Sequence, residues 1–186
     1  MTHVTEADLD DLEFDGLRTG QHRAAAVRLA ELADRATGAG GVSRAKVLLR
    51  AGEQFQHAGD HAHAAEVYRK AIEDGGEVYG DPRVYLADAL LKLDDKAGAL
   101  DLLAQVRDSR PDDPEVYRSV AEVLYEYGDL MGAHTWATLG ADLVLDMPAH
   151  ERGDAADSLE GLLRLRFRAR VDLGRPEDEY DDLLDA

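Results

Sequence analysis

The sequence predicts an all-α protein, a right-handed α-solenoid of about three to four antiparallel helix pairs. Three observations lead to this fold class. Apolar residues recur at intervals of three and four along most of the chain, which is the period of an amphipathic helix. Glycine or aspartate stands where one such pattern ends and the next begins. A pattern of about 34 residues occurs three times between residues 43 and 145.

Apolar spacing and end signals define each element in order. Patterns over 21–36, 44–57, 62–73 and 158–173 predict helices. The pairs Gly59-Asp60, Asp94-Asp95 and Gly128-Asp129 each close one helix and open another, as does Gly174 near the end. Asp81-Pro82 and Asp113-Pro114 read as a capping residue followed by proline at the first helical position. Residues 177–186 then predict a short, acidic last helix.

One stretch allows a second interpretation. In 162–173 apolar residues alternate with arginine, and by period alone that is a strand pattern. Leu, Arg and Ala are good helix formers, and a solitary strand would have no partner, so a helix is favoured. On that helix Arg164 and Arg168 share one face, and Arg166 and Arg170 lie on the opposite side.

Composition excludes several classes of function. The 186 residues are 45% hydrophobic, and 21 Lys and Arg oppose 39 Asp and Glu for a net charge of −18. Such a charge disfavours nucleic acid and anionic membrane surfaces. The absence of cysteine excludes disulfides and zinc sites built on sulfur. No apolar run approaches the ~18 residues of a membrane span, and the first residues lack a basic and apolar leader, so we expect a cytoplasmic protein.

The acid is concentrated in two segments. Residues 1–16 contain six acids and no Lys or Arg, and residues 177–186 contain six more. Like-charge blocks are usually solvated, so we expect residues 1–5 and the last few residues to be mobile, although Leu9, Leu12 and Leu17 allow a short helix within 6–18. The expected organisation is an acidic segment over 1–18, helical repeats over 19–145, a connection and capping helix over 146–176, and an acidic tail over 177–186.

Small and large residues fall into register across the three repeats. A small residue recurs in each second helix, another in each first helix, and a large residue follows the latter by three positions. Two helices cross closely only where a small residue lets the backbones approach. In this register the chain resembles the tetratricopeptide repeat, a 34-residue helix–turn–helix unit. The positions are Ala64, Ala99 and Ala133; Gly52, Ala87 and Ala121; and Phe55, Leu90 and Leu124.

This resemblance implies a groove lined by the first helix of each pair, which binds extended or helical peptides. The positions that match the groove are Leu49, Arg50, Glu53, Tyr85, Asp88, Lys92, Arg118, Glu122, Tyr125, Arg164 and Arg168. Tyr85 and Tyr125 are the strongest candidates, since tyrosine is enriched at binding hot spots. The clamp for a terminal carboxylate that chaperone-binding members carry is not matched, because Leu49, Glu53, Tyr85 and Arg118 stand in its places.

Catalysis has little support in the sequence. His57, His61 and His63 with Asp60 form a metal-like cluster, but they straddle a turn, and solvated turn residues are the favoured interpretation. Trp136 lies beside packing positions and is expected in the core. We therefore expect a non-catalytic protein-interaction module without cofactor or metal, and the alternative is a self-assembling structural protein that acts as a homo-oligomer. The ligand should be basic and apolar along most of its length, with an acidic residue near Arg164 and Arg168.

Overall fold

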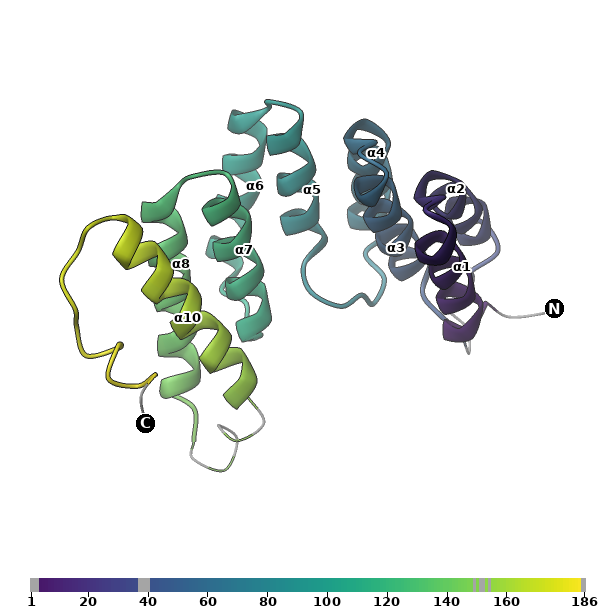
Figure 1. The fold of residues 1–186 in the computed structure, drawn as a ribbon. Coiled ribbons are helices and arrows are strands. Elements are labelled where there is room, and N and C mark those ends of the chain that lie inside the picture. Colours follow the sequence, from purple (N-terminus) through teal and green to yellow (C-terminus); the bar gives the residue numbers. More distant parts are fainter. Residues whose placement is uncertain (1–3, 37–40, 149, 151–152, 154, 185–186) are drawn as a thin grey trace. The chain divides into compact units, whose positions relative to one another are not determined.

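The computed structural model describes residues 4–36, 41–148, 150, 153 and 155–184. Within these residues all regular structure is helical and no strand occurs, so the all-α prediction is confirmed (Figure 1). The chain divides into two compact units, Met1–Gln105 and Val106–Ala186, and each is described by itself. No helix in the described part is both long and apolar enough to cross a membrane.

The first unit consists of antiparallel helix pairs (Figure 1). Within it, α3 packs against both α2 and α4, and α4 packs against α5. The division between the units falls inside α6. The helices are α1 (Glu6–Thr19), α2 (His22–Ala33), α3 (Arg44–His57), α4 (His61–Asp74), α5 (Pro82–Lys92) and α6 (Lys96–Ser109).

The predicted end signals form these helix boundaries. The Asp60 side chain accepts a hydrogen bond from the backbone N–H of His63 and so caps α4. Asp81 caps α5 in the same way, and Pro82 takes the first helical position, where no N–H is needed. Before α6 the left-handed position with φ 65° is held by Asp94, a residue type that tolerates this conformation better than most.

The small-residue register is confirmed in the core of this unit. A Cβ atom on Gly52 would lie 2.2 Å from Cε1 of Tyr68, so only glycine allows α3 and α4 to approach this closely. Ala64 and Ala87 have no exposed surface, and Phe55 and Leu90 are buried beside them. The repeat spacing therefore follows from contacts that leave no room for larger side chains.

The acidic amino-terminal segment is a packed helix. Thr5 and Asp8 form a reciprocal cap at the start of α1, and Leu9 is completely buried. Val4, expected to be mobile, is buried, and its carbonyl accepts a hydrogen bond from the backbone N–H of Val42 at 3.1 Å. Thr5, also expected to be mobile, is the capping residue of α1, and residues 1–3 and 185–186 lie outside the described residues.

The second unit contains α7 (Pro114–Glu126), α8 (Leu130–Leu145) and α10 (Ala156–Asp172). Helix α8 packs against both α7 and α10. Gly140 makes this possible, because a Cβ atom there would lie 2.7 Å from the Tyr117 Cβ and from Leu162 Cδ2. Trp136 belongs to the core as expected, being 7% exposed with its ring 5.6 Å from that of Tyr117.

The arginine-rich stretch is helical, and its inner arginines are buried. Arg166 and Arg170 lie inside the second unit, where Asp178 accepts two hydrogen bonds from Arg166 at 2.7 and 2.8 Å. Asp181 accepts from Nε of Arg170. The predicted helix over 177–186 is wrong for its described part, because residues 179–184 form turns. Aspartate side chains bond to the arginines and to the backbone N–H groups of Asp178 and Tyr180, and these bonds replace helical ones.

Candidate functional site

A polar and aromatic surface lies on adjacent helices of the first unit. Two residues of α3 and two of α5 are each spaced by three, so each pair shares a helix face. A tyrosine from the connection between α4 and α5 joins them. We call this surface the tyrosine–carboxylate face; it consists of Glu53, Gln56, Tyr79, Tyr85 and Asp88.

Hydrogen bonds hold the acids of this face in place. The Tyr68 hydroxyl donates to Oε1 of Gln56, and Nε2 of Gln56 donates to Oδ2 of Asp88, both at 2.5 Å. The Tyr79 hydroxyl donates to Glu53. Burial raises the pKa of the Glu53 carboxyl, and the bond from Tyr79 opposes that rise. Negative charge at Glu53 is therefore incompletely compensated.

Two tyrosine rings of the face meet edge to face. The ring centroids of Tyr79 and Tyr85 are 6.3 Å apart with an interplanar angle of 86°, and those of Tyr68 and Tyr85 are 5.8 Å apart. Burial raises the pKa of Tyr85 to about 12, so its hydroxyl remains a donor at neutral pH. That hydroxyl has no hydrogen-bond partner among the residues that the structure describes.

Three residues of the first unit that were predicted to line the groove are buried or already paired with acids of the chain. Leu49 has no exposed surface, so it is a core residue and not part of a groove. The Arg50 side chain is 13% exposed and donates to Glu6, Asp10 and Glu13 of α1, so its charge is already matched. Lys92 lies 3.7 Å from Asp88, one helical turn away on α5.

The second unit presents an arginine face on α7 and α10. The guanidinium of Arg168 lies 4.7 Å from the centre of the Tyr125 ring, and the Tyr125 hydroxyl donates to Asp172 at 2.5 Å. Arg164 donates to Glu160 one turn earlier on α10. The predicted residues Arg118 and Glu122 are bonded to each other at 2.8 Å, and Arg118 also reaches Glu115.

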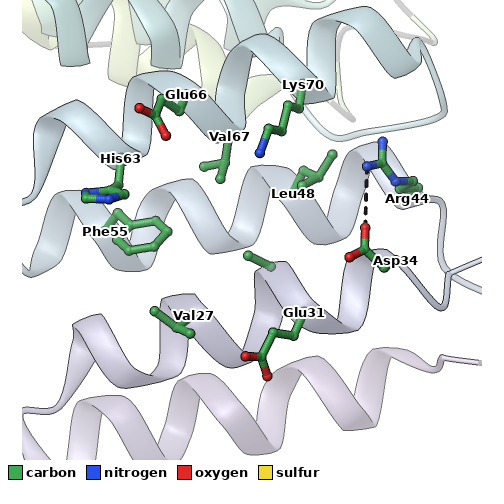
Figure 2. A pocket seen from close by; sticks show the side chains of 11 residues that line it. Val27, Glu31, Asp34, Arg44, Leu48, Phe55, His63, Glu66, Val67 and Lys70 are labelled. Carbon is green, nitrogen blue, oxygen red and sulfur yellow. Dashed lines mark ion pairs between the residues drawn. The ribbon is translucent and has the colours of Figure 1, made fainter.

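A hollow of about 310 Å³ lies elsewhere in the first unit, between α2 and α4 above α3. Figure 2 shows Leu48, Phe55 and Val67 at its floor, with charged side chains around them. Arg44 pairs with Asp34 across 3.7 Å at one end. Two further acids and one lysine line the hollow, so its lining has little net charge; these residues are Glu31, Glu66 and Lys70.

The histidine cluster makes local contacts. Nδ1 of His63 lies 2.7 Å from Oδ1 of Asp60, and the His63 ring stacks on Phe55 at 5.4 Å. Asp60 also accepts from Arg23, and these bonds lower its pKa to about 2. Over the described residues, no group of three or more His, Cys, Asp or Glu is arranged to hold a metal ion.

Sequence reasoning missed Tyr79 and Asp172. Tyr79 stands in a connection, outside the repeat register, and no sequence pattern marks it. Asp172 lies four residues after Arg168 on α10, so the shared helix face was a usable signal. The Tyr79 hydroxyl donates a hydrogen bond to Glu53, and Asp172 accepts one from the Tyr125 hydroxyl.

Residues 56–123 match a protein-family model, and this stretch includes Tyr85, Asp88 and Arg118. The matching model describes a tetratricopeptide repeat. The matched stretch lies inside the three-repeat region predicted from spacing, and the helices observed there agree with it. A comparison with curated proteins finds no match to the chain. Tetratricopeptide repeats generally mediate protein–protein interactions, and this coarse role is the one the match supports.

Proposed function

We propose that the chain is a non-catalytic protein-interaction module that binds an exposed segment of a partner protein on the first helices of its pairs. The observation that carries the proposal is the tyrosine–carboxylate face, where two tyrosine rings flank fixed carboxylates. Tyrosine offers contact area and a donor with only two rotatable bonds, so ordering it on binding costs little entropy. The net charge of −18 supports a protein over a nucleic acid as the partner.

The face favours a basic side chain with apolar neighbours. A lysine or arginine of the partner would gain cation–π contact with Tyr79 or Tyr85 and Coulombic attraction to Glu53 and Asp88. The nearest arginine on α3 does not compete, because Arg50 is matched by three acids of α1. Bringing a cation to Glu53 would also relieve the burial penalty on that carboxylate.

The second unit favours the opposite charge. Arg168 rests on the Tyr125 ring and has no carboxylate partner among the described residues. An acidic group of a partner that approached Arg164 and Arg168 would pair with a guanidinium whose position the ring already restricts. The proposed ligand is therefore basic and apolar for the first unit and acidic for the arginine face.

A panel of labelled peptides tests the basic half of the proposal. Three peptides of equal length, one alternating lysine with leucine, one arginine with leucine and one glutamate with leucine, are titrated by fluorescence anisotropy. We expect the two basic peptides to bind the chain and the acidic one to bind more weakly. Tyr85→Ala should weaken basic-peptide binding by ~1–2 kcal/mol, as loss of a hot-spot tyrosine does. Asp88→Asn should weaken it and reduce its salt dependence.

The matched control is Arg69→Ala, at an exposed position on α4. It removes a cation from the same unit and should not weaken a basic ligand that binds the tyrosine–carboxylate face. Equal affinities for the wild-type chain and Tyr85→Ala, in peptides that do bind, would show that the ligand uses another surface.

A further inference from the structure

The exposed side of α1 carries the two most exposed large apolar side chains in the described part of the chain. Leu17 is 72% exposed and Phe14 is 66% exposed, whereas the others in this class do not exceed 49%. These two residues are three apart, so they share one face of the helix. Exposed apolar side chains that cluster on one helix mark an interaction site more often than scattered ones do.

Two acids lie one turn before Phe14 on the same helix. Asp10 accepts a hydrogen bond from Arg50 and is still 66% exposed, and Asp11 forms no ion pair with any described residue. The whole helix contains six acids and one basic residue, Arg18. The outer side of α1 is therefore a short amphipathic surface, apolar at Phe14 and Leu17 and negatively charged at Asp10 and Asp11. We call it the acidic α1 face.

A surface of complementary character lies on α10. A hollow of about 570 Å³ is lined by Arg164, Phe167, Arg168 and Leu184. Phe167 is 39% exposed, and Val171, one turn further along α10, is 49% exposed. The guanidinium groups of two arginines lie beside this apolar strip: Arg164 is bonded to Glu160, and Arg168 has no carboxylate partner among the described residues. We call it the basic α10 face.

We propose that the basic α10 face binds the acidic α1 face of a second copy of the chain, so that copies associate head to tail. Phe14 and Leu17 of one copy would enter the hollow between Phe167 and Leu184 of the next, with Asp10 and Asp11 near Arg164 and Arg168. The inference rests on the proposed function only in assigning Arg164 and Arg168 to an acidic partner. What it adds is the identity of that partner, which is α1 of a second copy.

Charge and fold both support this occupant. An acidic chain repels most copies of itself, so a basic patch that matches its most acidic helix selects one orientation of approach. Stacked helical repeats bury an exposed helix face against the next helix, and α1 presents such a helix. Because the two surfaces differ, the contact does not close on itself in a pair, and each copy retains one open face.

Two blocked variants make the test specific. Phe14→Ser with Leu17→Ser removes the apolar centre of the acidic α1 face. Arg164→Glu with Arg168→Glu reverses the charge of the basic α10 face at exposed positions and spares the core. Sedimentation velocity is measured from about 1 µM to about 500 µM, a range that includes the weak affinities typical of small interfaces.

The wild-type chain should grow in weight-average mass beyond twice the monomer as concentration rises. Each blocked variant alone should remain monomeric. An equimolar mixture of the two should form a dimer and stop there, because each pair then has one intact contact and no open face that works. Only a head-to-tail contact between two different surfaces gives this pattern.

Matched controls separate the contact from general changes in charge or apolarity. Arg69→Glu with Arg107→Glu has the same charge change at exposed positions elsewhere, and Leu100→Ser with Leu139→Ser removes two leucines that are each 40% exposed. Both should associate as the wild type does. A wild-type chain that remains monomeric throughout the range would overturn the proposal, and so would variants that associate as before or a mixture that stays monomeric. Tyr85→Ala should self-associate normally, so failure of this contact is distinguishable from failure of basic-peptide binding.

Discussion

Single residues decide how closely helices meet in this chain. Gly52 is the clearest case, because the Tyr68 ring occupies the space that any Cβ would need. Glu53, one position later on α3, shows a second effect: its carboxyl is held in a largely buried setting by one tyrosyl hydroxyl. Gly52 therefore sets how closely α3 and α4 approach, and the surroundings of Glu53 set the pKa of its carboxyl.

Gly52→Ala should lower the stability of the first unit. Alanine gains ~1 kcal/mol of helix propensity over glycine, but a contact of 2.2 Å with a buried ring forces a shift that costs about 1–3 kcal/mol. We expect a net loss of up to about 2 kcal/mol in urea unfolding. Glu73→Ala, at an exposed position on α4, is the control and should change stability by less than ~0.5 kcal/mol. A stabilised Gly52→Ala chain would show that α4 moves freely away from α3.

Glu53→Gln should change how stability depends on pH. Because burial raises the folded pKa of Glu53 above 4.5, the folded state holds this proton more tightly than the unfolded state does. The stabilisation from that proton is complete below pH 4.5 and is lost as pH rises through the folded pKa. Glu53→Gln should therefore gain stability relative to the wild type between pH 4 and pH 7 in urea melts.

An NMR titration of the Glu53 carboxyl carbon checks the same point directly. Tyr79→Phe removes the hydroxyl that stabilises the ionised form, so the pKa of Glu53 should rise further in that variant. A pKa below 4.5 in the wild-type chain would contradict the burial argument.

Whole elements are joined by ion pairs that the repeat pattern does not describe. α1 is tied to α3 through Arg50, and the described part of the last segment is tied to α10 through Arg166 and Arg170. In both cases one or two guanidinium groups bind carboxylates from a stretch that composition alone marks as solvated acid. The acids of these segments therefore serve partly as structural partners.

Asp178→Asn should destabilise the second unit. The Arg166 side chain is 5% exposed, so loss of its carboxylate leaves a buried charge with Thr138 as a remaining partner. We expect a loss of ~1–3 kcal/mol, below that for a fully buried pair because Asp178 itself is 31% exposed. Asp182→Asn, at an exposed neighbouring acid, should be nearly neutral in the same thermal melts.

The same variant has an expected pH signature. The hydrogen bonds from Arg166 lower the pKa of Asp178, so its contribution is present above its unfolded pKa near 3.8 and is lost as pH falls through the folded value. The stability difference between wild type and Asp178→Asn should therefore shrink on acidification. A difference that is constant from pH 7 to pH 2 would mean that the loss is not electrostatic.

The molecule as a whole carries far more acid than base. With a net charge of −18, repulsion among the acids destabilises the folded state at neutral pH. The local ion pairs have the opposite effect and stabilise it. The ion pairs are short-range contacts, which salt screens weakly, whereas the repulsion among unpaired acids acts over longer distances, which salt screens strongly. We therefore expect this repulsion to determine how the stability of the fold changes with ionic strength.

Raising NaCl at pH 7 should raise the urea midpoint of the wild-type chain. Between about 0.01 M and about 0.1 M salt the Debye length shortens from about 30 Å to about 10 Å, which screens the general repulsion more than close pairs. Near pH 4.6, the isoelectric point of the sequence, the gain should vanish or reverse. A midpoint that falls with salt at pH 7 would show that ion pairs outweigh the repulsion.

The sequence by itself determined the helices of the repeats, the capping residues at their starts and the register of small residues. Asp60, Asp81 and Asp129 cap helices as predicted, because capping depends on groups within three residues of one another. Gly52 and Ala64 mark a helix crossing because packing requires a small residue there, whatever surrounds the pair. These properties are local, or repeat at a fixed period, and a sequence shows both.

Only the tertiary structure decided which groove positions are surface and what they contact. Leu49 is core, Arg50 is matched by acids about forty residues earlier in the chain, and Tyr79 enters the face from a connection outside the register. The described part of the last acidic segment forms turns, because buried arginines on α10 attract its aspartates. Whether a side chain is buried, and which group it contacts, depends on the angle at which helices meet and on partners distant in sequence. The periodicity of apolar residues along a helix gives no information about either.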